Sequence, residues 1–153
     1  TGTPSRRAAS RSSAEMGERD SAMATRVISI TAGGVTMEAS LDGSATADAV
    51  WDALPITSRV SLWGDEMYFA IPVQAVEATD ARATVNIGDV GYWPPGNAFC
   101  VFWGPTPMSR GNEIRPASPV NVFGSVIGDA RLFGRVSSGS RVEVTRGSPR
   151  ESV

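Results

Sequence analysis

Apolar and polar residues alternate along several short segments of the chain, a period that is typical of β-strands. Residues 26–31 alternate, and residues 35–41 place four apolar side chains on one face and three polar ones on the other. Gly33 and Gly34 stand between the two segments and can form a tight turn. This pattern predicts a β-hairpin at the start of the ordered part of the chain.

One segment has the spacing of a helix instead. Ser44 is a suitable N-cap, and Pro55 ends the pattern. The apolar residues between them recur on one side at Ala47, Val50, Trp51 and Leu54. We therefore expect one short amphipathic helix, with Trp51 as an anchor in the core.

The rest of the chain contains many short strand candidates separated by Gly or Pro. A second hairpin is expected where residues 58–63 and 66–71 flank a Gly64-Asp65 turn. The other candidates are residues 82–85, 90–93, 98–103, 121–127, 131–136 and 141–145. So many strands with one helix predict a mainly β fold, either a sandwich or a barrel, and we favour a closed barrel because closure removes exposed strand edges.

Residues 105–119 interrupt this regularity with four prolines and no alternation. Loops longer than about 12–15 residues in a compact domain are often functional or lid-like. The segment also carries Arg110, Glu113 and Arg115. A loop that only covers the core and a loop that contributes to a site both fit this composition.

The length of 153 residues suits one domain with one core. Residues 1–22 are rich in Ser, Ala, Arg and Thr without apolar periodicity, so we predict a disordered tail there, a β-barrel domain over residues 23–146 and a second tail over residues 147–153. No apolar run approaches the ~18 residues of a membrane helix. We expect a cytoplasmic protein with no membrane partner.

Absent residue types exclude several kinds of chemistry. The chain has no His, and all 14 of its basic residues are Arg. It therefore has no Ser-His-Asp triad, imidazole zinc site, lysine Schiff base or phosphate-binding lysine. The single Cys100 cannot form an internal disulfide or a paired-cysteine metal site. With a net charge of −2, we expect no nucleic-acid partner, and we expect no metal or cofactor.

The most informative stretch is residues 88–105, GDVGYWPPGNAFCVFWGP. Two strands that carry aromatic residues flank the turn Pro94-Pro95-Gly96-Asn97. Proline fixes φ and glycine permits a positive φ, so the turn holds Trp93 and Phe99 on either side of a defined corner. Such a corner can serve packing or recognition.

This stretch, followed by SPVNVFGSVIGDARLFGRVSSGSRVEV from Ser118 to Val144, resembles a small prokaryotic family of uncharacterised proteins with a cyclophilin-like fold. The resemblance covers about residues 26–146. It implies a closed, mostly antiparallel β-barrel of about eight strands with one short helix, similar to the barrel of the prolyl isomerase cyclophilin.

The resemblance does not extend to the residues of the isomerase. If Pro72 is matched to the proline at the end of the cyclophilin strand, Phe69 falls at the position of the arginine. Ala98 then takes the place of the glutamine, Cys100 that of a phenylalanine and Val120 that of the histidine. An isomerase would need another cation, for which Arg110 and Arg115 are the candidates.

These substitutions leave an apolar lining, which favours a binding module without catalytic residues for a small molecule or a peptide. The candidate ligand contacts are Tyr68, Phe69, Trp93, Pro94, Asn97, Cys100 and Glu113. Two alternatives stay open. The protein could be an enzyme, as a weak prolyl isomerase or through Glu66, Asp89 or Glu113, or it could be a structural domain of a larger assembly. Nothing in the sequence indicates an oligomeric state.

Overall fold

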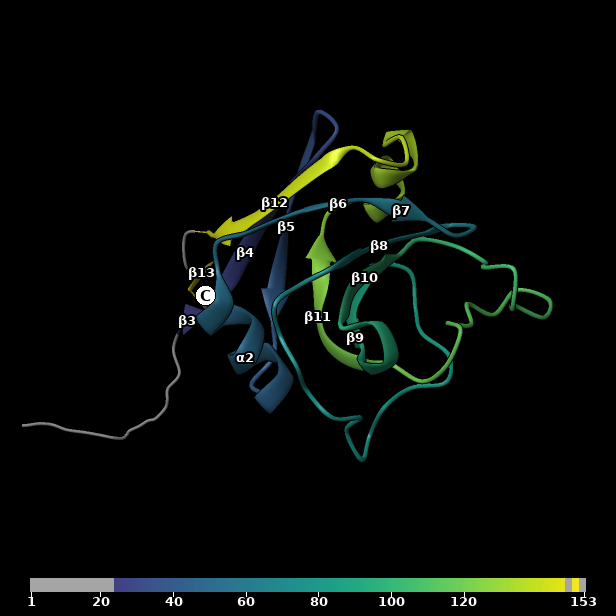
Figure 1. The fold of residues 1–153 in the computed structure, drawn as a ribbon, viewed down its shortest axis with the longest axis horizontal. Coiled ribbons are helices and arrows are strands. Elements are labelled where there is room, and N and C mark those ends of the chain that lie inside the picture. The colour runs from purple at the N-terminus through teal and green to yellow at the C-terminus, as the bar shows by residue number, and fades with distance from the viewer. Residues whose placement is uncertain (1–23, 148–149, 152–153) are drawn as a thin grey trace, which may run out of the picture. The chain divides into compact units, whose positions relative to one another are not determined.

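The computed structural model describes residues 24–147 and 150–151, which fall into two units. The larger unit, Val27–Gly147, is one antiparallel sheet of nine strands that curls into a nearly closed barrel (Figure 1). Its elements are β4 (Val27–Ala32), β5 (Val35–Leu41), α2 (Ala45–Ala53), β6 (Ile56–Arg59), β7 (Ser61–Leu62), β8 (Glu66–Ala70), β9 (Asp89–Trp93), the 3-10 helix η1 (Pro94–Gly96), β10 (Ala98–Phe102), β11 (Asn121–Ile127), the 3-10 helix η2 (Ala130–Arg135) and β12 (Arg141–Arg146). The mainly β barrel with one short α-helix is confirmed.

The other unit contains the short strands β3 (Ala24–Thr25) and β13 (Arg150–Glu151), which pair antiparallel. Strand β13 falls within the predicted C-terminal tail. The tail predicted over residues 1–22 lies outside the described residues, as do residues 148–149 and 152–153.

The first predicted hairpin and the predicted helix are both confirmed. Strands β4 and β5 pair around Gly33 and Gly34, whose φ values of 53° and 87° lie in the region that glycine tolerates. The Ser44 side chain caps α2 by accepting a hydrogen bond from the Ala47 N–H at 3.1 Å. Trp51 is half-buried against the core, and the Arg146 guanidinium lies 4.7 Å from the centre of its ring.

The barrel is closed by a change of partner within one stretch of chain. The sheet order is β6-β12-β4-β5-β11-β9-β10-β8-β7, so its two edge strands are consecutive in sequence and only Val60 separates them. Val60 donates its N–H to the Ser140 carbonyl at 2.9 Å and accepts from the Gly139 N–H at 2.7 Å. The second hairpin is therefore only partly formed, because β7 pairs with β8 while β6 pairs with β12.

Residues 131–136 were predicted as a strand, but residues 131–135 belong to the 3-10 helix η2 and Val136 is its C-cap. The Asp129 side chain caps it by accepting from the Arg131 N–H at 3.1 Å. Its buried positions are Ala130, Phe133 and then Val136, a spacing of three that matches the three residues per turn of a 3-10 helix. Phe133 packs against Trp103 with 6.5 Å between ring centres. The strand prediction was wrong because, over so short a segment, apolar residues spaced by three resemble an alternation of apolar and polar residues.

Residues 82–85, also predicted as a strand, form only two isolated bridges. Arg82 pairs with Val120, and Val85 pairs with Ile114. Both partners border or lie within the long segment 105–119, which is irregular as expected. The two bridges attach that segment to the barrel without adding a strand.

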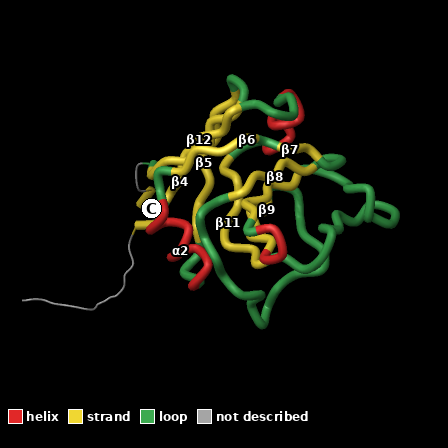
Figure 2. The backbone as a smooth tube through the Cα atoms, in the orientation of Figure 1, coloured by secondary structure: helices red, strands yellow, loops and turns green. Residues whose placement is uncertain are grey.

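The chain buries apolar residues on both sides of β8, β9 and β10. Inside the barrel, the ring of Phe99 stacks on Phe69 at 4.9 Å and meets Phe123 edge-on at 5.5 Å. A second cluster lies on the outer face of the same strands, and it consists of Val85, Ala98, Cys100, Phe102, Ile114 and Val120. All five residues of β10 are consequently buried. Figure 2 shows the long loops, in green, gathered on this side of the barrel.

Candidate functional site

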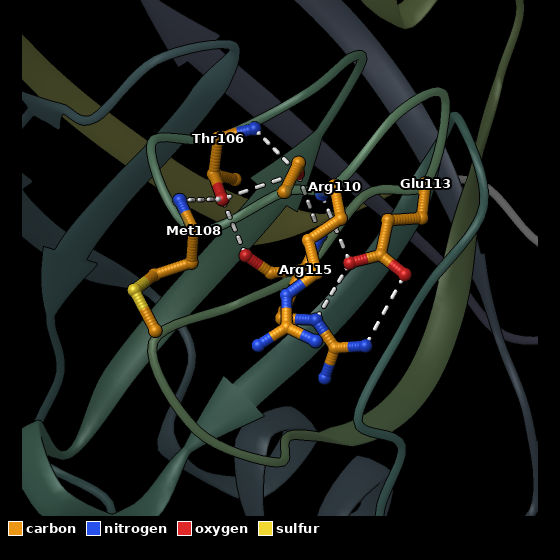
Figure 3. A network of polar contacts seen from close by, with 6 residues as sticks. Thr106, Met108, Arg110, Glu113 and Arg115 are labelled. Carbon is orange, nitrogen blue, oxygen red and sulfur yellow. Dashed lines mark hydrogen bonds and ion pairs between the residues drawn. The ribbon is translucent and has the colours of Figure 1, made fainter.

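The long loop 105–119 is held in shape by its own polar side chains (Figure 3). The buried Thr106 hydroxyl donates to the Arg115 carbonyl and accepts from the Met108 N–H. The Ser109 hydroxyl oxygen accepts from the N–H groups of Thr106 at 2.9 Å and Arg115 at 3.0 Å. These bonds cross the base of the loop, so the loop has a defined conformation although it forms no helix or strand.

The charged residues of this loop pair with one another. The Arg115 guanidinium donates from Nε to Glu113 at 2.6 Å and from a terminal nitrogen at 3.2 Å, and Arg110 donates its N–H to the same carboxylate at 3.1 Å. Figure 3 shows the carboxylate of Glu113 turned toward the Arg115 guanidinium. The hydrogen bond from Arg115 is the main cause that lowers the pKa of Glu113. Arg110, Glu113 and Arg115 do not line the pocket that lies between this loop and the sheet.

A pocket of about 280 Å³ lies between this loop and the outer face of the sheet. Its lining comprises Trp63, Glu66, Tyr68, Trp93, Cys100, Pro116, Ala117 and Val120. In the β8–β10 ladder Cys100 lies opposite Tyr68, and Glu66 lies two residues from Tyr68 on the same face. The structure thus brings together Tyr68, Trp93 and Cys100, three of the predicted ligand contacts, and adds Glu66 to them.

Trp93 forms one wall of the pocket, and two neighbours fix its indole. The indole N–H donates a hydrogen bond to the Ser118 hydroxyl at 2.7 Å. On its other side the ring lies against Gly96, where a Cβ atom would come within 2.7 Å of the ring. Gly96 belongs to the turn η1, so the rigid corner predicted from the sequence positions this side chain.

Among the described residues of the lining, Glu66 alone carries a charged side chain, and only 5% of it is exposed. Burial raises the pKa of its carboxyl from 4.5 to about 7, while a hydrogen bond with the Cys100 thiol acts in the lowering direction. Among the described residues, no basic side chain forms an ion pair with it. At neutral pH the pocket therefore contains a carboxyl group that exchanges readily between its two protonation states.

Cys100 lies in the same pocket wall and is 2% exposed. Burial, followed by the neighbouring Glu66 carboxylate, raises the pKa of its thiol well above the usual range. The thiol therefore stays protonated at neutral pH. Since the thiolate is the nucleophilic form, Cys100 serves as an apolar wall with a weak hydrogen-bond donor.

The remaining predicted contacts lie elsewhere. Phe69 is 1% exposed with its ring in the barrel core, and Asn97 has a φ of 48° in the turn and accepts from the Tyr92 hydroxyl at 2.9 Å. Pro94 is the half-buried first residue of η1. Of the other carboxylates considered for catalysis, Asp89 accepts from the Asn86 N–H at 2.8 Å and closes a turn.

A second hollow, of about 470 Å³, runs from the seam between β6 and β8 toward Trp93. It is lined by Ser58, Arg59, Ser61, Tyr68, Phe69, Ala70, Trp93, Gly96 and Ala98. Because the ring of Phe69 is buried in the core, this residue offers the hollow little beyond its backbone. Tyr68 and Trp93 contribute to the lining of both hollows.

The sequence alone does not distinguish Glu66 from the other two candidate carboxylates, Asp89 and Glu113, because Glu66 stands directly after the Gly64-Asp65 turn. The signal that singles it out is its position at the start of β8, two residues before Tyr68 on the same face. The loop 105–119 buries that face, and the sequence does not show which residues of the loop lie over which residues of the strand.

The family model described as cyclophilin-like matches residues 26–145. The chain belongs to the cyclophilin-like family. It is similar to the solution structure of the hypothetical protein AF2241 from Archaeoglobus fulgidus, with 37% identity, a TM-score of 0.72 and coverage of 86% of this chain and all of that one. This similarity confirms both the expected family and the expected fold.

The chain is also similar in fold to the structure of McbB in complex with tryptophan, at 20% identity and a TM-score of 0.61. That similarity covers 82% of this chain and 46% of McbB. At this level of identity the likeness concerns the fold alone. A comparison with curated proteins found no significant match.

Two of the positions that replace cyclophilin residues, Cys100 and Val120, do line the pocket of this cyclophilin-like barrel. Phe69, matched to the isomerase arginine, points inward, and the outward-facing residue beside it on β8 is Tyr68. Arg110 and Arg115 do not line the pocket, and the Arg115 guanidinium is paired with Glu113. The pocket of this chain is thus apolar and aromatic around a single acidic group.

Within residues 24–147 and 150–151, no three His, Cys, Asp or Glu side chains are grouped in a way that would hold a metal ion. In the same part of the chain, no helix has the length and apolar character needed to cross a membrane.

Proposed function

We propose that this cyclophilin-like barrel is a binding module, and that the pocket between the loop 105–119 and the strands β8, β9 and β10 takes a small molecule with an apolar, ring-containing body. The observation that carries the proposal is a formed pocket walled by three aromatic side chains, Trp63, Tyr68 and Trp93. Small-molecule sites are typically concave and mostly apolar, with a few placed polar groups.

The size of the pocket favours a small molecule over a peptide. Its volume of about 280 Å³ is close to the lower end of the roughly 300–1,000 Å³ of ligand pockets. Pro116 and Ala117 of the loop form part of its wall. A peptide would need an open groove along the barrel, whereas this pocket accommodates little more than one ring with a short chain.

The same geometry argues against the isomerase alternative. A cyclophilin-type site needs a cation beside the substrate proline, and the two arginines considered for that role, Arg110 and Arg115, do not line the pocket. Arg115 is already engaged with Glu113. Binding without chemistry is therefore the function that the residues in the pocket support best.

The proposal can be tested with neutral aromatic fragments, for which 4-methylphenol and 2-phenylethanol are suitable probes. In NMR titrations we expect amide shifts in β8, β10 and residues 116–120. The variant Ala117→Trp should block binding, since Ala117 is exposed at the mouth of the pocket and lines it. The matched control is Ala81→Trp, because residue 81 lines neither hollow.

Fragments that shift only residues outside this region, or that bind Ala117→Trp as well as the native protein, would refute the proposal. Failure of all neutral and charged fragments to bind at millimolar concentration would refute it as well.

A further inference from the structure

Among the described residues, the acidic group of the pocket has no counterion. The Glu66 carboxyl is 5% exposed and lines the cavity, and no described basic side chain reaches it. Burying a carboxylate costs a large free energy unless a cation or hydrogen-bond donors compensate it. Of the residues that the structure describes, the Cys100 thiol is the one hydrogen-bonding neighbour that lowers the pKa of this carboxyl, and a thiol is a weak donor. The cavity beside Glu66 is therefore a place where a positive charge would be stabilised.

The aromatic residues of the same pocket add to this preference. The face of an indole or phenol ring carries partial negative charge and attracts cations placed within about 6 Å of its centre. Trp63, Tyr68 and Trp93 all contribute to the lining with Glu66. None of the described residues that line the pocket is basic. The described side chains that line the cavity therefore carry either no charge or, at Glu66, a negative one.

We propose that the pocket recognises an organic cation, namely the ammonium group of a small amine whose apolar body contacts the aromatic walls, with Glu66 as its counterion. This inference rests on the proposed binding function and names the class of ligand. Glu66 accepts an N–H hydrogen bond from the ammonium group, and the rings of the pocket enclose the rest of the ligand. No covalent step is involved.

The pairing makes binding depend on pH in a defined direction. The cation binds the ionised form of Glu66, so affinity should rise as pH increases through the pKa of this group, near 7, and binding below it should release a proton. The other titratable groups in the lining are Tyr68, on β8, and Cys100, on β10. The residues that β9 and the loop contribute, Trp93, Pro116 and Ala117, carry no charge.

Three probes of similar size separate charge from shape: 2-phenylethylammonium, the neutral 2-phenylethanol and the anionic 3-phenylpropanoate. We expect calorimetric titration of the native protein at about pH 8.5 to show the cation at least about ten-fold tighter than the alcohol, and the anion weakest. At about pH 5.5 the preference for the cation should fall about ten-fold, while the alcohol should be unaffected.

The variant Glu66→Gln keeps the shape of the side chain and removes its charge. It should lose both the preference for the cation and the pH dependence, so that the cation and the alcohol bind the variant with similar affinity. Glu143→Gln is the matched control, since Glu143 is exposed on β12 and lines neither hollow. Titration of the native protein in two buffers with different ionisation enthalpies measures the proton release without any variant.

The outcomes distinguish the two proposals. Equal binding of alcohol and cation, tighter binding of the anion, or a pH dependence that persists in Glu66→Gln would overturn the cation inference and leave the binding module in place. If no probe binds, both fail.

Discussion

The indole N–H of Trp93 and the hydroxyl of Ser118 are joined by a 2.7 Å hydrogen bond. Trp93 ends β9 at the rigid turn η1, and Ser118 belongs to the long loop 105–119. The bond therefore fixes the loop to the sheet beside the pocket. It connects residues 25 positions apart in sequence, which neither local pattern nor composition could indicate.

Removing this hydrogen bond should loosen the loop while leaving the barrel folded. For Ser118→Ala we expect a loss of about 1 kcal/mol or less in the free energy of unfolding, because one net hydrogen bond is removed at a partly buried site. Hydrogen exchange should become faster in residues 105–119 and remain unchanged in β4, β5 and β12. Ser125→Ala, at an exposed position of β11, is the control. Unchanged exchange in the loop would show that its internal hydrogen bonds hold it without Trp93.

The pocket wall should also depend on Gly96. A Cβ atom at this position would come within 2.7 Å of the Trp93 ring, so Gly96→Ala must displace the indole. We expect a change in tryptophan fluorescence and at least about ten-fold weaker binding of 2-phenylethanol, which corresponds to about 1.4 kcal/mol. Gly111→Ala is a suitable comparison because a Cβ there would meet nothing within 4 Å, although its positive φ adds some strain. Native-like fluorescence in Gly96→Ala would contradict the prediction.

The buried Glu66 should make the protein less stable as pH rises. Its pKa is about 7 in the folded state against 4.5 ordinarily, so between these values the folded protein binds a proton that the unfolded chain has released. The contribution of this group to the free energy of unfolding is fully present below about pH 4.5. It falls by up to about 3 kcal/mol between about pH 4.5 and pH 7, and it changes no further at higher pH. Denaturant unfolding of native protein and Glu66→Gln across this range measures the difference.

We expect Glu66→Gln to be more stable than the native protein at about pH 8 and nearly as stable as the native protein at about pH 4.5. The control variant Glu143→Gln should show no such difference between the two pH values. Parallel stability curves for Glu66→Gln and the native protein would show that the carboxyl titrates normally.

Cys100 should be unreactive in the folded protein. It is 2% exposed, so a reagent in solution cannot reach its sulfur atom. Burial also raises the pKa of its thiol, so little of the nucleophilic thiolate form is present. With a disulfide reagent such as dithiobis(nitrobenzoic acid) at about pH 8, we expect labelling only as fast as the protein unfolds and rapid labelling in denaturant. Rapid labelling of the native protein would mean that the pocket opens widely to solvent.

The stacked rings of Phe69 and Phe99 inside the barrel should contribute strongly to the free energy of unfolding. Phe99→Ala removes a ring that stacks on Phe69 and meets Phe123, and we expect a loss of about 3–5 kcal/mol. Leu132→Ala is the control, since 36% of Leu132 is exposed, and it should change stability by about 0.5 kcal/mol or less. Chemical denaturation measures both. A similar loss for the two variants would contradict the placement of Phe99 in the core.

Local pattern was sufficient for the elements whose period is unambiguous. The hairpin around Gly33 and Gly34 and the helix capped by Ser44 follow from residues adjacent in sequence. It was insufficient at η2, where Ala130, Phe133 and Val136 have a spacing of three that a short segment does not distinguish from alternation. It was also insufficient at Val60, because a change of strand partner is decided by the closure of the whole barrel.

The candidate site could likewise be predicted from the sequence only in part. The turn 94–97 predicted a fixed corner at Trp93, and alternation along β8 and β10 brings Tyr68 together with Cys100. Phe69 does not line the pocket beneath the loop, since its ring lies in the barrel core and Tyr68 is the residue of β8 that faces the pocket; a match by sequence does not show which face of the strand is outward. The importance of Glu66 arises from the covering loop, and the position of a loop cannot be derived from its composition.

The pairing of the barrel's first strand, β4, with its last, β12, brings the two ends of the unit together, and Gly147 donates its N–H to the Val27 carbonyl at 2.7 Å. A unit whose ends lie side by side can be inserted into a surface loop of a host protein without stretching either, and it tolerates circular permutation. The barrel is thus a transferable module: it can carry its pocket into a different polypeptide as one piece.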